Sequence, residues 1–192
     1  RQRGRERMSK GRLFVISGAS GVGKSTVLGK VMGARNDLSF SVSATTRPPR
    51  PGEVEGKSYY FVSRDRFEEM IRQDAFLEYD EHAGNFYGTP RQQLEEKLEK
   101  GSVILDIEPV GAFHVREKAP DAVLIFVMPP TRTELEHRLR TRGDTSEEQI
   151  RMRLDRANWE MDQSTRYDYV VVNDQVDECA RRILSIIAEK AD

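Results

Sequence analysis

Residues 18–25 read GASGVGKS, which places two glycines, a lysine and a serine at a spacing suited to binding phosphate. The spacing fits the pattern G-x-x-x-x-G-K-[ST], whose glycines let backbone N–H groups turn inward around phosphate oxygens. Lys24 can reach the β- and γ-phosphates, and the Ser25 hydroxyl can ligate Mg²⁺. A chance glycine-rich turn is the alternative, which the preceding strand and following helix disfavour. The pattern predicts a nucleoside triphosphate site formed by Gly18, Ala19, Ser20, Gly21, Val22, Gly23, Lys24, Ser25 and Thr26.

Residues 43–53 read SATTRPPRPGE, in which Arg47 and Arg50 are separated by two prolines. Proline fixes φ and removes a backbone donor, so this stretch cannot be the interior of a helix or of a central strand. Two guanidinium groups on a stiffened loop can fork onto phosphate oxygens. Tyr59 and Tyr87 add hydroxyl donors on rings that could shield such a site. A solvated charged turn is the alternative to this anion site.

Glu78 has the chemistry to read guanine, whose N1–H and N2–H₂ groups are adjacent donors that one carboxylate can accept. Adenine presents an acceptor at N1 and would repel that carboxylate. A hydroxyl of Ser43 or Thr89 could donate to guanine O6. Because unpaired buried polar groups are costly, such a site discriminates strongly between bases. Taken alone, Glu78 is more commonly a surface acid, and it is the flanking pattern that favours recognition.

Asp106 ends an apolar run, where a P-loop protein usually places a carboxylate for the metal and its waters. A solvated turn residue is the alternative. We therefore expect Asp106 and Ser25 to bind Mg²⁺.

These residues need a scaffold, and short apolar runs predict its buried strands at 13–17, 102–107, 122–128 and 169–173, with a weaker one at 40–46. Helical patterns lie between them, after Lys24 and at 90–100, 109–118, 131–141, 146–163 and 175–190. Thr89 is the expected N-cap of the helix at 90–100, and Gly101 its stop. The alternation predicts a parallel sheet with helices on both faces. Residues 45–89 break it, with a helical pattern at 64–73 and two strands around residues 83–85, which indicates a small antiparallel insertion.

The composition limits the kinds of partner that the protein can bind. Acidic and basic residues number 32 and 31, so no nucleic-acid or membrane surface is expected. No stretch is apolar enough to span a bilayer, and residues 1–10 are expected to be a disordered N-terminal extension. The single Cys179 excludes an internal disulfide and fits a reducing compartment, so a cytoplasmic location is expected.

The chain resembles the guanylate kinases, which phosphorylate GMP to GDP with ATP. The resemblance runs from about residue 11 to about residue 187 and is carried by SGASGVGKST, SATTRPPRPGEVEGKSYYFV, FLEY, GNFYGT, ILDIEPVG, RLRTRG and VVVND. It implies an α/β, three-layer P-loop kinase fold with a parallel sheet, an inserted small mixed or antiparallel GMP-binding unit and a helical lid. The expected core comprises residues 11–44, 90–137 and 161–192, the GMP-binding insertion residues 45–89, and the lid residues 138–160.

The resemblance also implies residue roles. Arg47, Arg50, Tyr59 and Tyr87 correspond to residues that hold the GMP phosphate, and Glu53 to one that orders the arginine loop. Asn173 matches a position near the adenine of ATP. The implied GMP-binding set is Ser43, Arg47, Arg50, Glu53, Tyr59, Glu78, Tyr87, Thr89 and Glu108. The chain departs from the family pattern at Ala19, where proline is common, and in GDTSEE after Arg142.

Residues 133–160 carry three arginines, Arg138, Arg142 and Arg153, of which the first two are four residues apart on one helix face. A solvated basic stripe is the alternative from the residues alone. The resemblance implies that this segment closes over ATP, with Gly143 as a hinge, and brings these arginines to the transferring phosphoryl group. The expected catalytic set is Lys24, Arg47, Arg138, Arg142 and Arg153.

The leading hypothesis is therefore a kinase that uses ATP and Mg²⁺ to phosphorylate GMP or dGMP. A kinase for AMP or dTMP, a catalytically inactive binding module of the same family, and a GTPase are the alternatives. The intact phosphate loop disfavours the binding module, and the arginine–proline loop would have no role in a GTPase. The sequence leaves open whether the protein forms a homo-oligomer.

Overall fold

The computed structural model describes residues 11–141 and 146–191. Its larger sheet has five parallel strands in the order β2–β7–β1–β8–β9. The strands are β1 (Leu13–Gly18), β2 (Ser39–Phe40), β7 (Val103–Asp106), β8 (Val123–Met128) and β9 (Tyr169–Val172). The chain therefore has the predicted α/β architecture with a parallel sheet.

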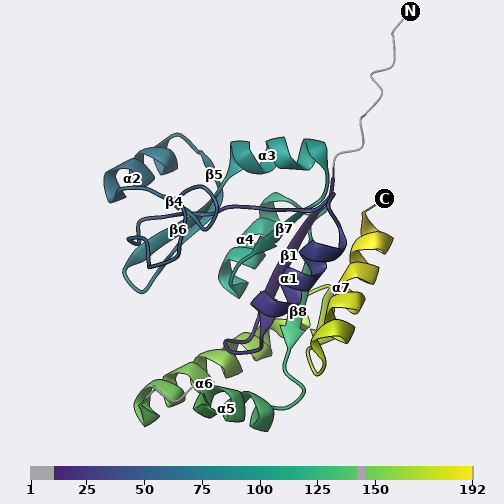
Figure 1. Ribbon diagram of the computed structural model, residues 1–192. Coiled ribbons are helices and arrows are strands. Elements are labelled where there is room, and N and C mark those ends of the chain that lie inside the picture. Colours follow the sequence, from purple (N-terminus) through teal and green to yellow (C-terminus); the bar gives the residue numbers. More distant parts are fainter. Residues whose placement is uncertain (1–10, 142–145, 192) are drawn as a thin grey trace, which may run out of the picture.

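Helices cover both faces of this sheet. Helices α1 and α7 pack against each other on one side, and α4 lies on the other (Figure 1). The bounds are α1 (Lys24–Ala34), α3 (Arg91–Lys100), α4 (Pro109–Lys118) and α7 (Val176–Lys190). Strand β1 runs toward the end of the sheet where α5 (Arg132–Thr141) and α6 (Glu147–Asp162) lie, and α6 continues into the short 3₁₀ helix η1 (Gln163–Arg166). In the described residues no helix is both long and apolar enough to cross a membrane.

The apolar runs that predicted the central strands are buried as expected. Phe14, Ile16, Leu105, Leu124 and Phe126 are fully buried between the helices. The edge strand β9 differs, because alternate side chains in it are exposed, Val170 at 44% and Val172 at 50%. An edge strand needs only one face covered, so the prediction of burial on both faces was wrong there.

A second, four-stranded mixed sheet has the order β4–β3–β6–β5. Its elements are β3 (Ala44–Thr45), β4 (Tyr60–Phe61), helix α2 (Arg64–Arg72), β5 (Phe76–His82) and β6 (Asn85–Pro90). The turn between β5 and β6 lies where the sequence indicated, and Ala83 and Gly84 in it have positive φ. Figure 1 shows this unit beside the larger sheet.

Two sequence predictions need correction here. The single weak strand at 40–46 is two strands, because the chain leaves the larger sheet after Phe40 and joins the smaller one at Ala44. Thr89 is not an N-cap, since it pairs within β6, and α3 is preceded by Pro90 as its cap residue. In both places a tertiary pairing takes residues that the local pattern assigned to a different element.

The small unit has its own aromatic core. The Phe67 ring stacks on Phe76 and Phe86, with ring centroids 4.4 and 5.2 Å away. Gly88 lies against this stack, and a Cβ atom at that position would lie 2.7 Å from Cδ1 of Phe76 and 3.1 Å from Cζ of Phe67. The β6 backbone therefore approaches the rings too closely to admit a side chain.

We expect Gly88→Ala to lower the free energy of unfolding by about 1–3 kcal/mol, the usual cost of overpacking a core. Gly29→Ala is the matched control, because nothing lies within 4 Å of a Cβ at that position of helix α1. Chemical denaturation of both variants measures the difference. Equal stability of the two variants would contradict this packing.

Candidate active site

The phosphate loop joins β1 to α1 in the predicted place. Gly21 and Gly23 have φ of 82° and 85°, a left-handed conformation that side chains other than glycine adopt at a cost. Helix α1 begins at Lys24, so its free N–H groups face the loop. The loop lines a cavity of about 460 Å³ together with His82, Glu108, Arg156 and Glu160. The geometry is that of an anion-binding cradle.

Lys24 and Asp106 meet beside this loop. Asp106 ends β7 next to Ile16 of β1, and its Oδ1 atom lies 2.5 Å from Nζ of Lys24. Ser25 is exposed in the first turn of α1 and lines the same cavity as Lys24. A hydroxyl and a carboxylate are hard oxygen ligands, and Mg²⁺ prefers few protein ligands plus phosphate and water. The two residues therefore fit the expected metal.

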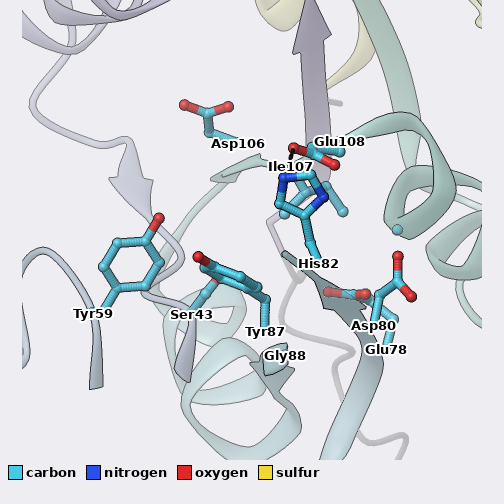
Figure 2. Close-up of a pocket in the computed structure, with 11 residues that line it drawn as sticks. Ser43, Tyr59, Glu78, Asp80, His82, Tyr87, Gly88, Asp106, Ile107 and Glu108 are labelled. Carbon is cyan, nitrogen blue, oxygen red and sulfur yellow. Dashed lines mark ion pairs between the residues drawn. The ribbon is translucent and has the colours of Figure 1, made fainter. Parts of the chain in front are cut away.

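A second cavity of about 220 Å³ lies between the two sheets (Figure 2). It brings together residues from β5, β6 and β7, from the segments after β2 and before β4, and from the segment after β7 and the start of α4. The cavity is lined by Ser43, Tyr59, Glu78, Asp80, His82, Tyr87, Gly88, Asp106, Ile107, Glu108 and Gly111. Of the nine predicted GMP-binding residues, five line it directly: Ser43, Tyr59, Glu78, Tyr87 and Glu108.

Glu78 is a buried carboxylate at the inner end of this cavity. It is 6% exposed, and its Oε1 atom accepts a 2.8 Å hydrogen bond from the hydroxyl of its cross-strand neighbour Thr89. Burial raises the pKa of Glu78, and the Thr89 hydrogen bond partly offsets this. A Cβ atom on Gly111 of helix α4 would lie 3.1 Å from Oε2 of Glu78, so a glycine there leaves room for the carboxylate.

The arginine–proline loop is held by Glu53. Its two carboxylate oxygens accept from both terminal nitrogens of Arg47, at 2.8 and 2.9 Å, and Oε1 also accepts from the backbone N–H of Arg50. The Arg47 guanidinium lowers the pKa of Glu53 to about 2. Arg47 also lies over the Tyr59 ring, 5.2 Å from its centroid, and Tyr59 packs against Tyr87. The Arg50 side chain is exposed and lines no described cavity.

A third cavity, of about 340 Å³, lies on the other side of the phosphate loop. Arg138 and Asn173 line it, and both donate to the Val22 carbonyl, at 3.4 and 2.8 Å. Asn173 is 3% exposed, and its Oδ1 atom has no hydrogen-bond partner among the described residues.

Of the other two predicted lid arginines, the structure describes only Arg153. Arg153 is exposed on α6 and lines none of these cavities, and Arg142 lies outside the described residues. Sequence reasoning missed three residues at the phosphate-loop cavity: His82, Arg156 and Glu160. The only available signal was the i, i+4 spacing of the last two on one helix.

A five-stranded parallel sheet with a phosphate loop after its first strand defines a P-loop nucleotide-binding protein, and the polar second cavity adds room for another ligand. A family model described as Guanylate kinase matches residues 10–190, and the chain belongs to the guanylate kinase family. This confirms the resemblance and the P-loop kinase fold read from the sequence.

The similar proteins agree with this family. The chain is 52% identical over 179 residues to a guanylate kinase of Thermus thermophilus, covering 93% of this chain and 81% of that one. It is 50% identical over 179 residues to a guanylate kinase of Lactococcus lactis, covering 93% and 87%. The crystal structure of guanylate kinase from Anaplasma phagocytophilum is 37% identical, with a TM-score of 0.77, covering 95% and 87%.

Proposed function

We propose that this protein transfers the γ-phosphoryl group of ATP to GMP or dGMP, giving ADP and GDP or dGDP. One observation carries the proposal: the phosphate-loop cavity and the Glu78 cavity share His82 and Glu108 in their walls. A nucleotide in one cavity would therefore lie next to a nucleotide in the other, as phosphoryl transfer between them requires. A GTPase has no use for the second cavity.

The acceptor nucleotide lies in the cavity between the sheets. The Glu78 carboxylate accepts from N1–H and N2–H₂ of guanine, and Thr89 and Ser43 supply hydroxyls for the base. Arg47, Arg50, Tyr59 and Tyr87 bind its phosphate, with Glu53 holding the arginine loop before binding. Figure 2 shows the Tyr59 and Tyr87 hydroxyls pointing toward the side of the cavity where Asp106 lies. Glu108 closes the boundary with the donor site.

The donor ATP binds residues 18–26, with its adenine beside Asn173. Mg²⁺, when bound through Ser25 and Asp106, would neutralise phosphate charge. Lys24 binds the phosphates of ATP, and Arg47 binds the phosphate of GMP. A GMP phosphate oxygen forms the new bond to the γ-phosphorus, the bond to the β–γ bridging oxygen breaks, and ADP leaves with that electron pair.

No strong general base is needed, because the phosphate of GMP is largely deprotonated near neutrality. Catalysis then consists of alignment and of cations that offset developing charge. Closure of residues 45–89 and 138–160 over the core, bringing Arg138, Arg142 and Arg153 to the phosphoryl group, would exclude water. The single Cys179, which is buried, is consistent with a cytoplasmic enzyme.

The direct test is a coupled assay of ADP release with ATP, Mg²⁺ and either GMP, dGMP, AMP, dTMP or no acceptor. We expect rapid turnover with GMP and dGMP only. Comparable turnover with AMP would contradict the role of Glu78. ADP release without an acceptor would indicate an ATP hydrolase, and none with any acceptor would indicate a binding module.

We expect Arg47→Lys to raise KM for GMP by about 10- to 100-fold, since a hydrogen bond to a charged group contributes about 1.5–3 kcal/mol and lysine cannot fork onto phosphate. Initial rates at varied GMP measure this, and KM for ATP should stay within about 2-fold because Arg47 lies outside the ATP cavity. Arg64→Lys is the control, an exposed arginine of the same unit that packs on Phe86. An unchanged KM for GMP in Arg47→Lys would remove Arg47 from the phosphate site.

A further inference from the structure

Helix α6 presents two charged residues, one turn apart, to the phosphate-loop cavity. Arg156 and Glu160 both line the phosphate-loop cavity, and their spacing of four residues places them on one face of the helix. Arg153, the arginine that the sequence favoured, lies about one turn before Arg156 on α6, but it is exposed and lines none of these cavities. The helix is therefore joined to the site through residues with no assigned role.

Arg156 is bound to the boundary between the cavities. Its Nη2 atom donates a 2.8 Å hydrogen bond to Oε2 of Glu108, and its guanidinium lies 4.6 Å from the centroid of the Trp159 ring. The other carboxylate oxygen of Glu108 lies 4.0 Å from Nε2 of His82, which comes from the end of β5 (Figure 2). Glu108 thus connects α6 with the small sheet.

Glu160 attaches the same helix to the phosphate loop. It is 5% exposed, and its Oε1 atom accepts a 3.2 Å hydrogen bond from the backbone N–H of Ser20. Burial raises its pKa, and the charges that act on it include Arg156, Glu108 and Lys24. One helix therefore touches the loop that binds ATP and the carboxylate that closes the GMP cavity.

We propose that Arg156 is a positioning residue that fixes the Glu108 carboxylate between the two nucleotide sites and, through helix α6, makes binding at one site favour binding at the other. This inference rests on the proposed GMP kinase activity and goes beyond it. Glu108 lines both cavities, and among the described residues Arg156 donates a hydrogen bond to its carboxylate.

Removing the Arg156 guanidinium should weaken the binding of both nucleotides. In the Arg156→Ala variant the Glu108 carboxylate loses its charge-assisted hydrogen bond and is free to turn into either cavity. Both anionic nucleotides then bind beside an unpaired negative charge, and α6 no longer links Glu108 to the loop. The two binding events should become nearly independent, because a coupling free energy needs an element that both sites bias.

Calorimetry of GMP binding, with and without a non-hydrolysable ATP analogue and Mg²⁺, measures this coupling. We expect the analogue to tighten GMP binding at least about 5-fold in the wild type and less than about 2-fold in Arg156→Ala. Arg156→Lys, which keeps the charge, should restore most of the effect. Arg151→Ala is the control, since Arg151 is exposed on the same helix and lines none of the cavities.

Kinetics and stability separate the alternatives. Arg156→Ala should raise KM for both GMP and ATP, and combining it with Glu108→Ala should add little, because both changes remove one interaction. Wild-type coupling in a folded Arg156→Ala protein, or none in the wild type, overturns the inference. If Arg156→Ala has a much lower melting temperature than the wild type, the same calorimetric and kinetic measurements are made on Arg156→Gln. If the wild type does not phosphorylate GMP, the proposed function is contradicted, and that result is distinct from a failure of this inference.

Discussion

Replacing Lys24 with methionine should lower kcat for GMP phosphorylation by at least about 10³-fold, the scale on which a single phosphate-binding cation acts in phosphoryl transfer. Methionine keeps the unbranched apolar stem and removes only the ammonium group. That group lies 2.5 Å from Asp106 at the phosphate loop, so its loss also leaves a carboxylate facing the phosphates without its cation. The fall is measured as steady-state kcat with saturating ATP and GMP.

The matched control is Lys30→Met on the same helix. Lys30 pairs with Asp177 at the surface and lines none of the described cavities, so this variant should keep wild-type kcat. Both variants should have the circular dichroism spectrum of the wild type. If Lys24→Met retains more than about a tenth of wild-type kcat, Lys24 does not act on the transferring phosphoryl group.

The sequence predicts most of the scaffold because the central strands carry their burial in their own composition. Strands β1, β7 and β8 are unbroken apolar runs between helical patterns, and such runs are stable only between two helical layers. The phosphate loop is equally local, since one short run of consecutive residues defines it. These features need no information from distant parts of the chain.

The segment between β2 and β3 was misread because its pairing is decided elsewhere. The backbone N–H of Ser41 donates to the carbonyl of Ile104 in the larger sheet, and shortly after it the carbonyl of Ser43 accepts from Tyr60 in the smaller one. One short segment thus serves two sheets. No local pattern distinguishes that from a single irregular strand.

The site was predictable where a residue type is specific to its chemistry and unpredictable where it is common. Glu78 and Arg47 could be proposed from the sequence because a carboxylate and a forked cation suit a guanine nucleotide, and the structure places Glu78 in the wall of a cavity. Arg156 and Glu160 escaped notice because a charged i, i+4 pair on a helix is usually a solvated stripe. Their role follows only from the position of α6 in the fold, where Glu160 contacts the phosphate loop and Arg156 contacts Glu108, which lines both cavities.

Glu78→Gln should weaken function and strengthen the fold. Glutamine can still accept the Thr89 hydrogen bond, but its NH₂ group would face one of the two guanine donors. We expect kcat/KM for GMP to fall at least about 10²-fold, the usual result of leaving a buried polar pair unmatched. Steady-state rates with GMP and AMP measure the fall in kcat/KM for GMP and the smaller ratio of kcat/KM for GMP to that for AMP.

The stability effect depends on pH with a defined sign. Burial raises the pKa of Glu78 above its ordinary value of 4.5, so the folded state resists losing that proton while the unfolded chain does not. The wild type therefore loses stability as pH rises above 4.5, and the neutral glutamine does not. The variant should melt like the wild type near about pH 4 and at a higher temperature near about pH 8. Glu81→Gln, an exposed position on the same strand, should show neither effect. A lower melting temperature for Glu78→Gln at the higher pH would mean that the carboxylate stabilises the fold, and that its burial is not a cost borne for recognising guanine.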